Sequence, residues 1–154
     1  MAVFTRLDSF VKQIALYLQN GDYQSAGALS SEMAAAFPHE MISHFLLAKS
    51  SFRLGKYAAA VDEGTQAFRL ARLREDMAAC AILVSIAMFM LRQYPEGYRM
   101  LLAFEPDNNE QVVELLLIFS SVLGDERATE KHIRALMRLD SEAADGLLSR
   151  FAVA

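Results

Sequence analysis

Three histidines and one cysteine are the side chains of this sequence that could most readily bind a metal or act as a nucleophile. His39, Glu40 and His44 look at first like the helix of a zinc protease, whose two histidines are four residues apart. Here they are five apart, and five residues turn a helix by roughly 140°, so the two imidazoles face different directions. His132 is distant in sequence, and no fourth ligand is evident. The residues therefore predict no metal site, and the histidines are interpreted as surface residues near a helix start.

Cys80 is the only cysteine, which excludes an internal disulfide bond and a cysteine-based zinc cluster. It lies in the apolar run MAACAILV, where burial is expected to raise the pKa of the thiol and leave it unreactive. The sequence has neither a glycine-rich phosphate loop nor a nucleophile-elbow motif. We therefore expect no enzymatic activity and no bound cofactor.

Glu105, Asp107 and Glu110 form an acidic cluster around Pro106. The segment lacks the alternating oxygen ligands and the central glycine of a calcium-binding loop. It is better interpreted as a loop that caps a helix.

Basic residues are too few for nucleic-acid binding, since 15 Lys and Arg against 19 Asp and Glu leave a net charge of −4. Arg69, Arg72 and Arg74 form the only basic run in the sequence. Its position near a predicted helix end favours an interaction with the helix dipole. Binding to the acidic tail of a partner is the alternative.

The elements that carry these residues belong to a globular chain, because 54% of its 154 residues are hydrophobic and 22% are charged. Asp8 and Lys12 interrupt the N-terminal apolar residues where a signal peptide needs a continuous core. Residues 77–91 are apolar except for Ser85, but such a helix measures only about 22 Å, less than the roughly 30 Å of a bilayer core. We expect a buried helix and an intracellular, reducing compartment, either cytoplasm or nucleus.

An internal repeat is the most informative feature of the sequence. Three residue types recur at one constant displacement: Gly21, Tyr23 and Ala26 return as Gly55, Tyr57 and Ala60. Each glycine separates two apolar runs, at a position where a helix C-terminus favours a left-handed residue. The repeat therefore predicts helical hairpins whose paired helices pack on the tyrosine and the small alanine.

This pattern resembles the tetratricopeptide (TPR) family, whose unit is a helix-turn-helix of about 34 residues, the same displacement. Pro38, which follows Gly21 by half a unit, falls at the family's unit boundary, and Tyr17 and Ala48 fall on its aromatic and small positions. The chain departs from the family pattern in having no tryptophan and in carrying Ser51 at an aromatic position. The resemblance implies an all-α protein, an α-solenoid of about four antiparallel helical hairpins.

Two further units are more divergent. Tyr94 and Gly97 follow their counterparts Tyr57 and Ala60 at a displacement three larger than that of the first two units, which implies an insertion near residues 72–75. Gly124 follows Gly55 by one position more than two full units. One domain over residues 1–154 is then expected to contain repeats at about 7–38, 41–74, 75–106 and 108–140, followed by a capping helix at 141–152. The expected helices run over about 4–19, 23–36, 39–54, 57–72, 75–92, 95–104, 108–123, 126–139 and 141–152.

The resemblance also implies a partner-binding groove on the first helix of each hairpin. The family's helix phase, carried over to this sequence, predicts that the groove is formed by Ile42, Phe45, Lys49, Phe52, Arg53, Ile82, Ile86 and Phe89. Only Lys49 and Arg53 could contribute to the carboxylate clamp of the family's chaperone-tail binders, so that function is disfavoured. An apolar groove suits an amphipathic helix or a second copy of the domain. The alternative is that Ile82, Ile86 and Phe89 are core residues.

Two subfamilies are similar in local pattern. FLLAKSSFRLGKY and QYPEGYRML resemble the N-terminal dimerisation domains of the scaffold subunits of the anaphase-promoting complex, which implies a scaffold and a homodimer. KSSFRLGKYAAAVDEG and LLIFSSVLGDERATEKHIRAL resemble small type III secretion chaperones, which implies that the groove holds a helical needle or translocator subunit. The apolar end of the sequence, Phe151 to Ala154, favours a domain cut from a longer scaffold, so the scaffold function is preferred.

Overall fold

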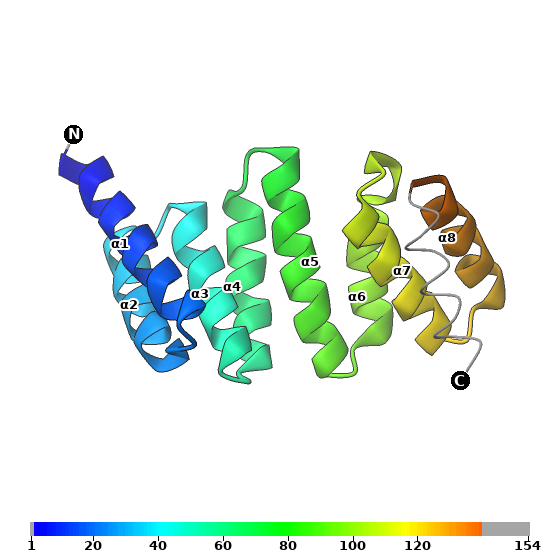
Figure 1. Cartoon of the computed structure of the whole chain (residues 1–154), viewed down its shortest axis with the longest axis horizontal. Helices are drawn as coiled ribbons and strands as arrows, with labels where there is room; N and C mark the ends of the chain where they lie inside the picture. The colour runs from blue at the N-terminus through cyan, green and yellow to red at the C-terminus, as the bar shows by residue number, and fades with distance from the viewer. Residues whose placement is uncertain (1, 140–154) are drawn as a thin grey trace. The chain divides into compact units, whose positions relative to one another are not determined.

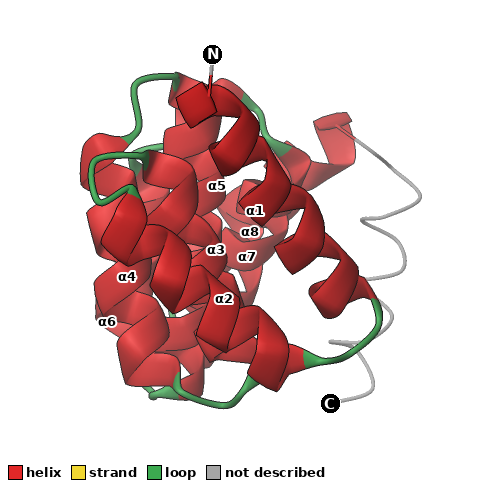
Figure 2. Cartoon of the chain, turned by 90° about the vertical axis from the view of Figure 1, so that its left-hand side faces the viewer, coloured by secondary structure: helices red, strands yellow, loops and turns green. Residues whose placement is uncertain are grey.

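The computed structural model describes residues 2–139, which are all helix, turn or loop. The elements follow one another along the chain as α1 (Ala2–Gln19), α2 (Tyr23–Ala36), α3 (Met41–Arg53), α4 (Tyr57–Leu70), α5 (Arg74–Met90), α6 (Tyr94–Leu102), the 3-10 helix η1 (Glu105–Asp107), α7 (Glu110–Val122) and α8 (Glu126–Leu139) (Figure 1). Short loops join the helices (Figure 2). The all-α prediction is confirmed, and the predicted capping helix at 141–152 lies outside the described residues.

The chain divides between Leu91 and Arg92 into two compact units. The first unit contains α1 to α5 and the second contains α6 to α8. The division falls in the turn of the third predicted hairpin. The predicted organisation as a single domain, with its repeat boundaries, stays a prediction.

In the first unit each helix packs against the next one, and α3 also contacts both α1 and α5. Ile14, Ala26, Met33 and Leu46 form a buried cluster among α1, α2 and α3. Partly buried residues such as Phe10 surround this cluster. Alternate helices α1, α3 and α5 are therefore successive neighbours, which is the arrangement that hairpin repeats produce.

The close packing of α4 depends on Gly64. A Cβ atom at this position would lie 2.5 Å from Cγ2 of Val84 on α5 and 3.8 Å from Cβ of Ala48 on α3. Ala60 and Ala67, one turn away on either side, are also fully buried. Small residues thus allow α4 to lie close to both of its neighbours.

The turns between paired helices use left-handed residues. Gly21, Gly55 and Gly124 have φ angles of 77°, 76° and 74°, and a Cβ at any of them would meet no atom within 4 Å. Their role is therefore conformational rather than steric. In the turn after α5 the same conformation is adopted by Arg92, with φ 61°. Arg92 follows Gly55 at the same displacement as Tyr94 follows Tyr57, which fits the predicted phase of the third unit.

The three extra residues of the third unit are helical. The loop before α5 spans residues 71–73, whereas the loop before α3 spans 37–40, so the loop is not longer. Instead α5 has 17 residues and α3 has 13. The insertion therefore extends the start of α5 by about one turn.

The second unit has its own core. Helix α7 packs against α6 and α8. Val113 and Leu117 of α7 and Leu136 of α8 form a buried cluster, and Ile133 packs against it. The first turn of α7 is capped by the side chain of Asn109, whose Oδ1 accepts a hydrogen bond of 3.2 Å from the Val112 amide. The carboxylates of the predicted capping loop do not make this cap; Glu105 and Asp107 lie in η1.

Replacing Gly64 with Ala is expected to lower the free energy of unfolding by about 1 to 2 kcal/mol. The steric conflict with Val84 outweighs the roughly 1 kcal/mol by which Ala exceeds Gly in helix propensity. Chemical denaturation of Gly64→Ala, Val84→Ala and the double variant measures the coupling. The double variant should be more stable than the sum of the two single losses implies, and strict additivity would contradict the close approach.

Replacing Arg92 with Gly is expected to raise the free energy of unfolding by about 0.5 to 1 kcal/mol, because glycine removes the left-handed strain but loses more backbone entropy. Gly124→Arg is the matched reverse change in the same unit and should destabilise it by about 1 kcal/mol. Urea denaturation measures both. Destabilisation by Arg92→Gly would show that the arginine side chain, rather than its backbone conformation, dominates at this turn.

Candidate partner-binding surfaces

The predicted groove residues lie on two neighbouring helices, α3 and α5. On α3, Phe45 and Phe52 are half-buried, whereas Lys49 and Arg53 are exposed. The predicted residues of α5, which are Ile82, Ile86 and Phe89, are also half-buried. The three α5 residues repeat the spacing of Phe45, Lys49 and Phe52 at the displacement of the third unit. The two stripes thus occupy equivalent positions on successive hairpins, and we name them together the α3–α5 face.

The repeat tyrosines contact the cationic and aromatic end of this face. The ring of Phe52 meets the ring of Tyr57 edge to face, with centroids 5.3 Å apart. The guanidinium carbon of Arg53 lies 5.9 Å from the centre of the Tyr23 ring. Tyr23 and Tyr57 are equivalent residues of the two repeats. The packing residues of the hairpins therefore also hold two of the predicted partner-binding side chains in place.

Ile42 differs from the other predicted residues because it packs against the buried cluster around Ile14 and Leu46. It also borders a hollow between the α2–α3 and α4–α5 loops, together with His39 and Asp76. The structure therefore places Ile42 at the junction between the core and the surface.

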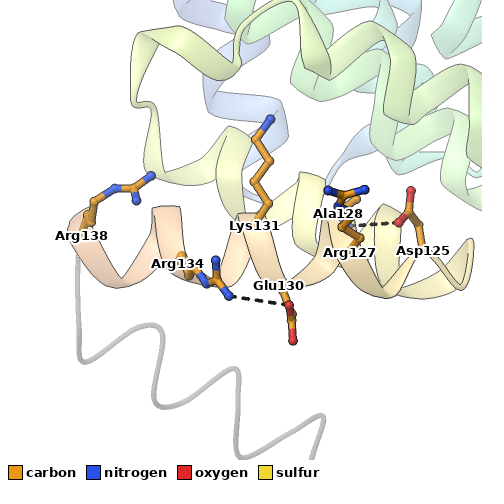
Figure 3. Close-up of a pocket in the computed structure, with 7 residues that line it drawn as sticks. All are labelled: Asp125, Arg127, Ala128, Glu130, Lys131, Arg134 and Arg138. Carbon is orange, nitrogen blue, oxygen red and sulfur yellow. Dashed lines mark hydrogen bonds and ion pairs between the residues drawn. The ribbon is translucent and has the colours of Figure 1, made fainter.

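A second surface, on α8, combines several basic side chains (Figure 3). They line a hollow of about 710 Å³ together with two carboxylates and an alanine, the full set being Asp125, Arg127, Ala128, Glu130, Lys131, Arg134 and Arg138. The buried side of the same helix carries His132 and Leu136. We name Arg127, Lys131, Arg134 and Arg138 the basic stripe. The stripe is not a contiguous basic run in the sequence, because two or three other residues separate its members, but their spacing is that of one helix face.

The contiguous basic run lies between α4 and α5. Arg69 is in the last turn of α4, where a cation interacts favourably with the helix dipole as predicted. Arg74, by contrast, is the first residue of α5. A cation is unfavourable at a helix N-terminus, so the dipole interpretation is wrong for Arg74. Glu75 and Asp76 in the same first turn offset its charge.

Two of the candidate chemical residues have structural roles. His44 Nε2 donates to the Pro38 carbonyl oxygen at 2.7 Å, and its Nδ1 lies 2.8 Å from a Glu63 carboxylate oxygen. Its side chain is only 13% exposed, so its interpretation as a surface histidine is wrong. Cys80 is fully buried. Burial, with a smaller effect of Asp76, raises the pKa of the Cys80 thiol to about 11, as predicted from the apolar run.

The described residues contain no group of three or more His, Cys, Asp or Glu side chains placed to hold a metal ion. Within residues 2–139, none of the helices has the length and hydrophobicity needed to cross a membrane.

Comparison with known proteins identifies the fold. No protein-family model matches the sequence, and no curated protein matches it. Among solved structures, the chain is similar to the TPR2B domain of yeast Sti1 in its complex with pHsp70. The TM-score is 0.59 at 10% sequence identity, and the match covers 90% of this chain and 98% of that chain. The chain therefore has a TPR-like fold.

His132 is a buried histidine of the second unit. It is 1% exposed, and its Nε2 lies 2.7 Å from the Tyr98 hydroxyl on α6. Its Nδ1 is buried without a hydrogen-bond partner among the described residues. Burial lowers the pKa of His132; Lys131 lowers it further, whereas Glu105 and Asp125 oppose the shift. A neutral ring with its proton on Nε2 fits this site, because Nε2 then donates to the Tyr98 oxygen and only protonation would add an unbonded proton at Nδ1.

The second unit is therefore expected to lose stability as the pH falls. The pKa of a histidine in the unfolded chain is near 6.5, and the pKa of His132 in the folded chain is lower. Between these two pKa values the unfolded state binds a proton that the folded state does not, so the free energy of unfolding decreases as the pH falls. The melting temperature of His132→Gln, measured between about pH 7 and about pH 5, should depend less on pH than that of the unchanged chain. Identical pH dependence would contradict the buried neutral histidine.

Proposed function

We propose that this chain is a non-enzymatic protein-interaction module whose α3–α5 face binds the apolar side of a partner's amphipathic helix. The observation that carries the proposal is the pair of equivalent stripes on α3 and α5, which are half-buried and apolar except for the exposed Lys49 and Arg53. Side chains seven residues apart, such as Phe45 and Phe52, lie on one side of a helix and can dock between successive turns of another helix. The TPR-like fold supports this proposal, because the similar yeast structure is itself a complex.

The charges on the face favour a partner helix flanked by acidic residues. Lys49 and Arg53 are exposed beside the half-buried rings. A carboxylate at the edge of the partner helix would pair with them and would accelerate encounter. Their main effect is therefore on association rate and salt dependence, whereas the rings supply most of the affinity.

The two subfamily functions differ in the helix that occupies the face. In a scaffold similar to the subunits of the anaphase-promoting complex, the occupant would be a second copy of the domain. In a type III secretion chaperone, it would be a secreted needle or translocator subunit. Two copies that met symmetrically through the α3 stripe would bring the Lys49 and Arg53 cations of both copies together. The charge pattern therefore favours a foreign helix, as in the chaperone function, over a symmetric homodimer through this stripe.

Phe52→Ala should weaken binding to the α3–α5 face by roughly 10- to 30-fold, since aromatic anchors carry much of the energy of an interface. The probe is a synthetic amphipathic helix with leucines on one side and flanking glutamates, titrated by isothermal calorimetry. Leu73→Ala is the matched control, because Leu73 is apolar and 58% exposed but lies in the α4–α5 loop. It should leave the affinity unchanged.

A peptide in which lysines replace the flanking glutamates tests the charge argument and should bind more weakly at low salt. Circular dichroism melting of each variant separates loss of binding from loss of fold. Equal affinity of Phe52→Ala and the unchanged chain would overturn the proposal, as would equal affinity for the two peptides. A concentration-dependent dimer abolished by Phe52→Ala would instead make a second copy of the chain the occupant, as the scaffold function requires.

A further inference from the structure

We propose that the basic stripe on α8 is a second binding surface, one that takes an acidic helical segment of a partner protein. It lies in the second unit, whereas the α3–α5 face belongs to the first. The inference therefore does not depend on the function proposed for that face.

The spacing of the stripe places four cations on one side of α8. Arg127, Lys131, Arg134 and Arg138 follow one another at intervals of four, three and four residues. At roughly 100° per residue, they fall within a sector of about 60° and extend over about 16 Å of helix. All four residues are exposed. The stripe is therefore a continuous line of positive charge along the outer side of an amphipathic helix.

This arrangement is unfavourable for the isolated helix. Like charges three or four residues apart each destabilise a helix by roughly 0.2 to 0.5 kcal/mol. Lys131 is partly neutralised by Glu105, 3.0 Å away, and Arg134 by Glu130, 3.7 Å away. Figure 3 shows the Arg134 and Glu130 side chains beside each other. The Arg134–Glu130 pair is exposed on both sides, and Lys131 is exposed in the other pair, so solvent screens both interactions.

The two ends of the stripe have no such partner. Arg127 and Arg138 form no ion pair with any carboxylate that the structure describes. The packing of the unit does not require them, because α8 uses its other side, with His132 and Leu136, for burial. An anionic ligand would remove the mutual repulsion and supply the missing partners.

The chemistry of the hollow favours carboxylates on a protein. Three of the four cations are arginines, whose guanidinium groups bind carboxylates through two parallel hydrogen bonds. Asp125 and Glu130 also line the hollow, and Ala128 leaves space between the longer side chains. The dense, regular phosphate charge of duplex DNA would meet both carboxylates. A helix with glutamates at intervals of four, three and four residues can instead match the cations.

The test uses the full chain and a fluorescein-labelled helical peptide that carries glutamates at those intervals. The double variant Arg127→Gln, Arg138→Gln should bind this peptide at least tenfold more weakly. It should also show a smaller decrease in affinity between about 0.05 and about 0.5 M salt. Arg69→Gln, Arg72→Gln is the matched control, because it removes the same charge at exposed positions of the first unit. Fluorescence anisotropy measures all affinities, and circular dichroism checks that each variant is folded.

Each other outcome would contradict the proposal. Equal loss of affinity in the control would mean that net charge alone governs binding, and equal affinity in the stripe variant would place the peptide elsewhere. Tighter binding of a DNA duplex than of the peptide would indicate a nucleic-acid surface. The alternative occupant of the basic stripe is an acidic segment of the chain itself, which contains Asp140, Glu142 and Asp145. A more than tenfold gain in peptide affinity on changing all three to amides would make that segment the occupant.

Discussion

The close approach of α4 to α3 and α5 is the constraint on which the first unit depends. Gly64 leaves no space for a methyl group against Val84 of α5, and the Cβ atom of Ala48 on α3 would lie 3.8 Å from that methyl group. Ala60 and Ala67 extend this contact along the buried side of α4. Dispersion forces between closely packed atoms are individually weak, but they act over the whole length of such a contact. A larger residue at Gly64 would separate the helices and weaken the dispersion forces along the whole contact.

The function proposed for the α3–α5 face follows from this packing. Helix α4 lies against both α3 and α5, and α3 and α5 also contact each other. Their outward side chains are therefore held at a fixed spacing, so that binding a partner needs little reorganisation. Tyr57 contributes to both properties, since it begins α4 and packs edge to face on Phe52. Tyr57, which is the repeat equivalent of Tyr23, thus both stabilises its hairpin and holds the Phe52 ring in position.

Much of the fold could be predicted from residue spacing because each hairpin is specified locally. The glycine turns at Gly21 and Gly55 and the tyrosines that follow them mark where one helix ends and the next begins. The left-handed turn at Arg92 was harder to predict, because a non-glycine residue adopts that conformation only when the surrounding helices impose it. The role of His44 was missed because its partners, Pro38 and Glu63, come from a loop and from the next helix.

The candidate sites were predictable to different degrees. The repeat spacing correctly assigned the groove residues to two neighbouring helices, but it could not show that Ile42 packs against the buried cluster. The basic stripe could be predicted from the sequence, because Arg127, Lys131, Arg134 and Arg138 have the spacing of one helix face. A search for contiguous basic residues does not find it. Whether such a stripe is exposed or buried depends on the packing of α7 against the opposite side of α8, which periodicity alone leaves open.

Native-state hydrogen exchange tests most directly whether α4 holds α3 and α5 together as one surface. Because the three helices share the contact at Gly64, their central amides should exchange through a common opening with similar free energies. Those free energies should exceed that of the end of α8, where residues 137–139 are exposed. Exchange of α3 or α5 through an independent, lower-energy opening, while α4 stays protected, would contradict the account.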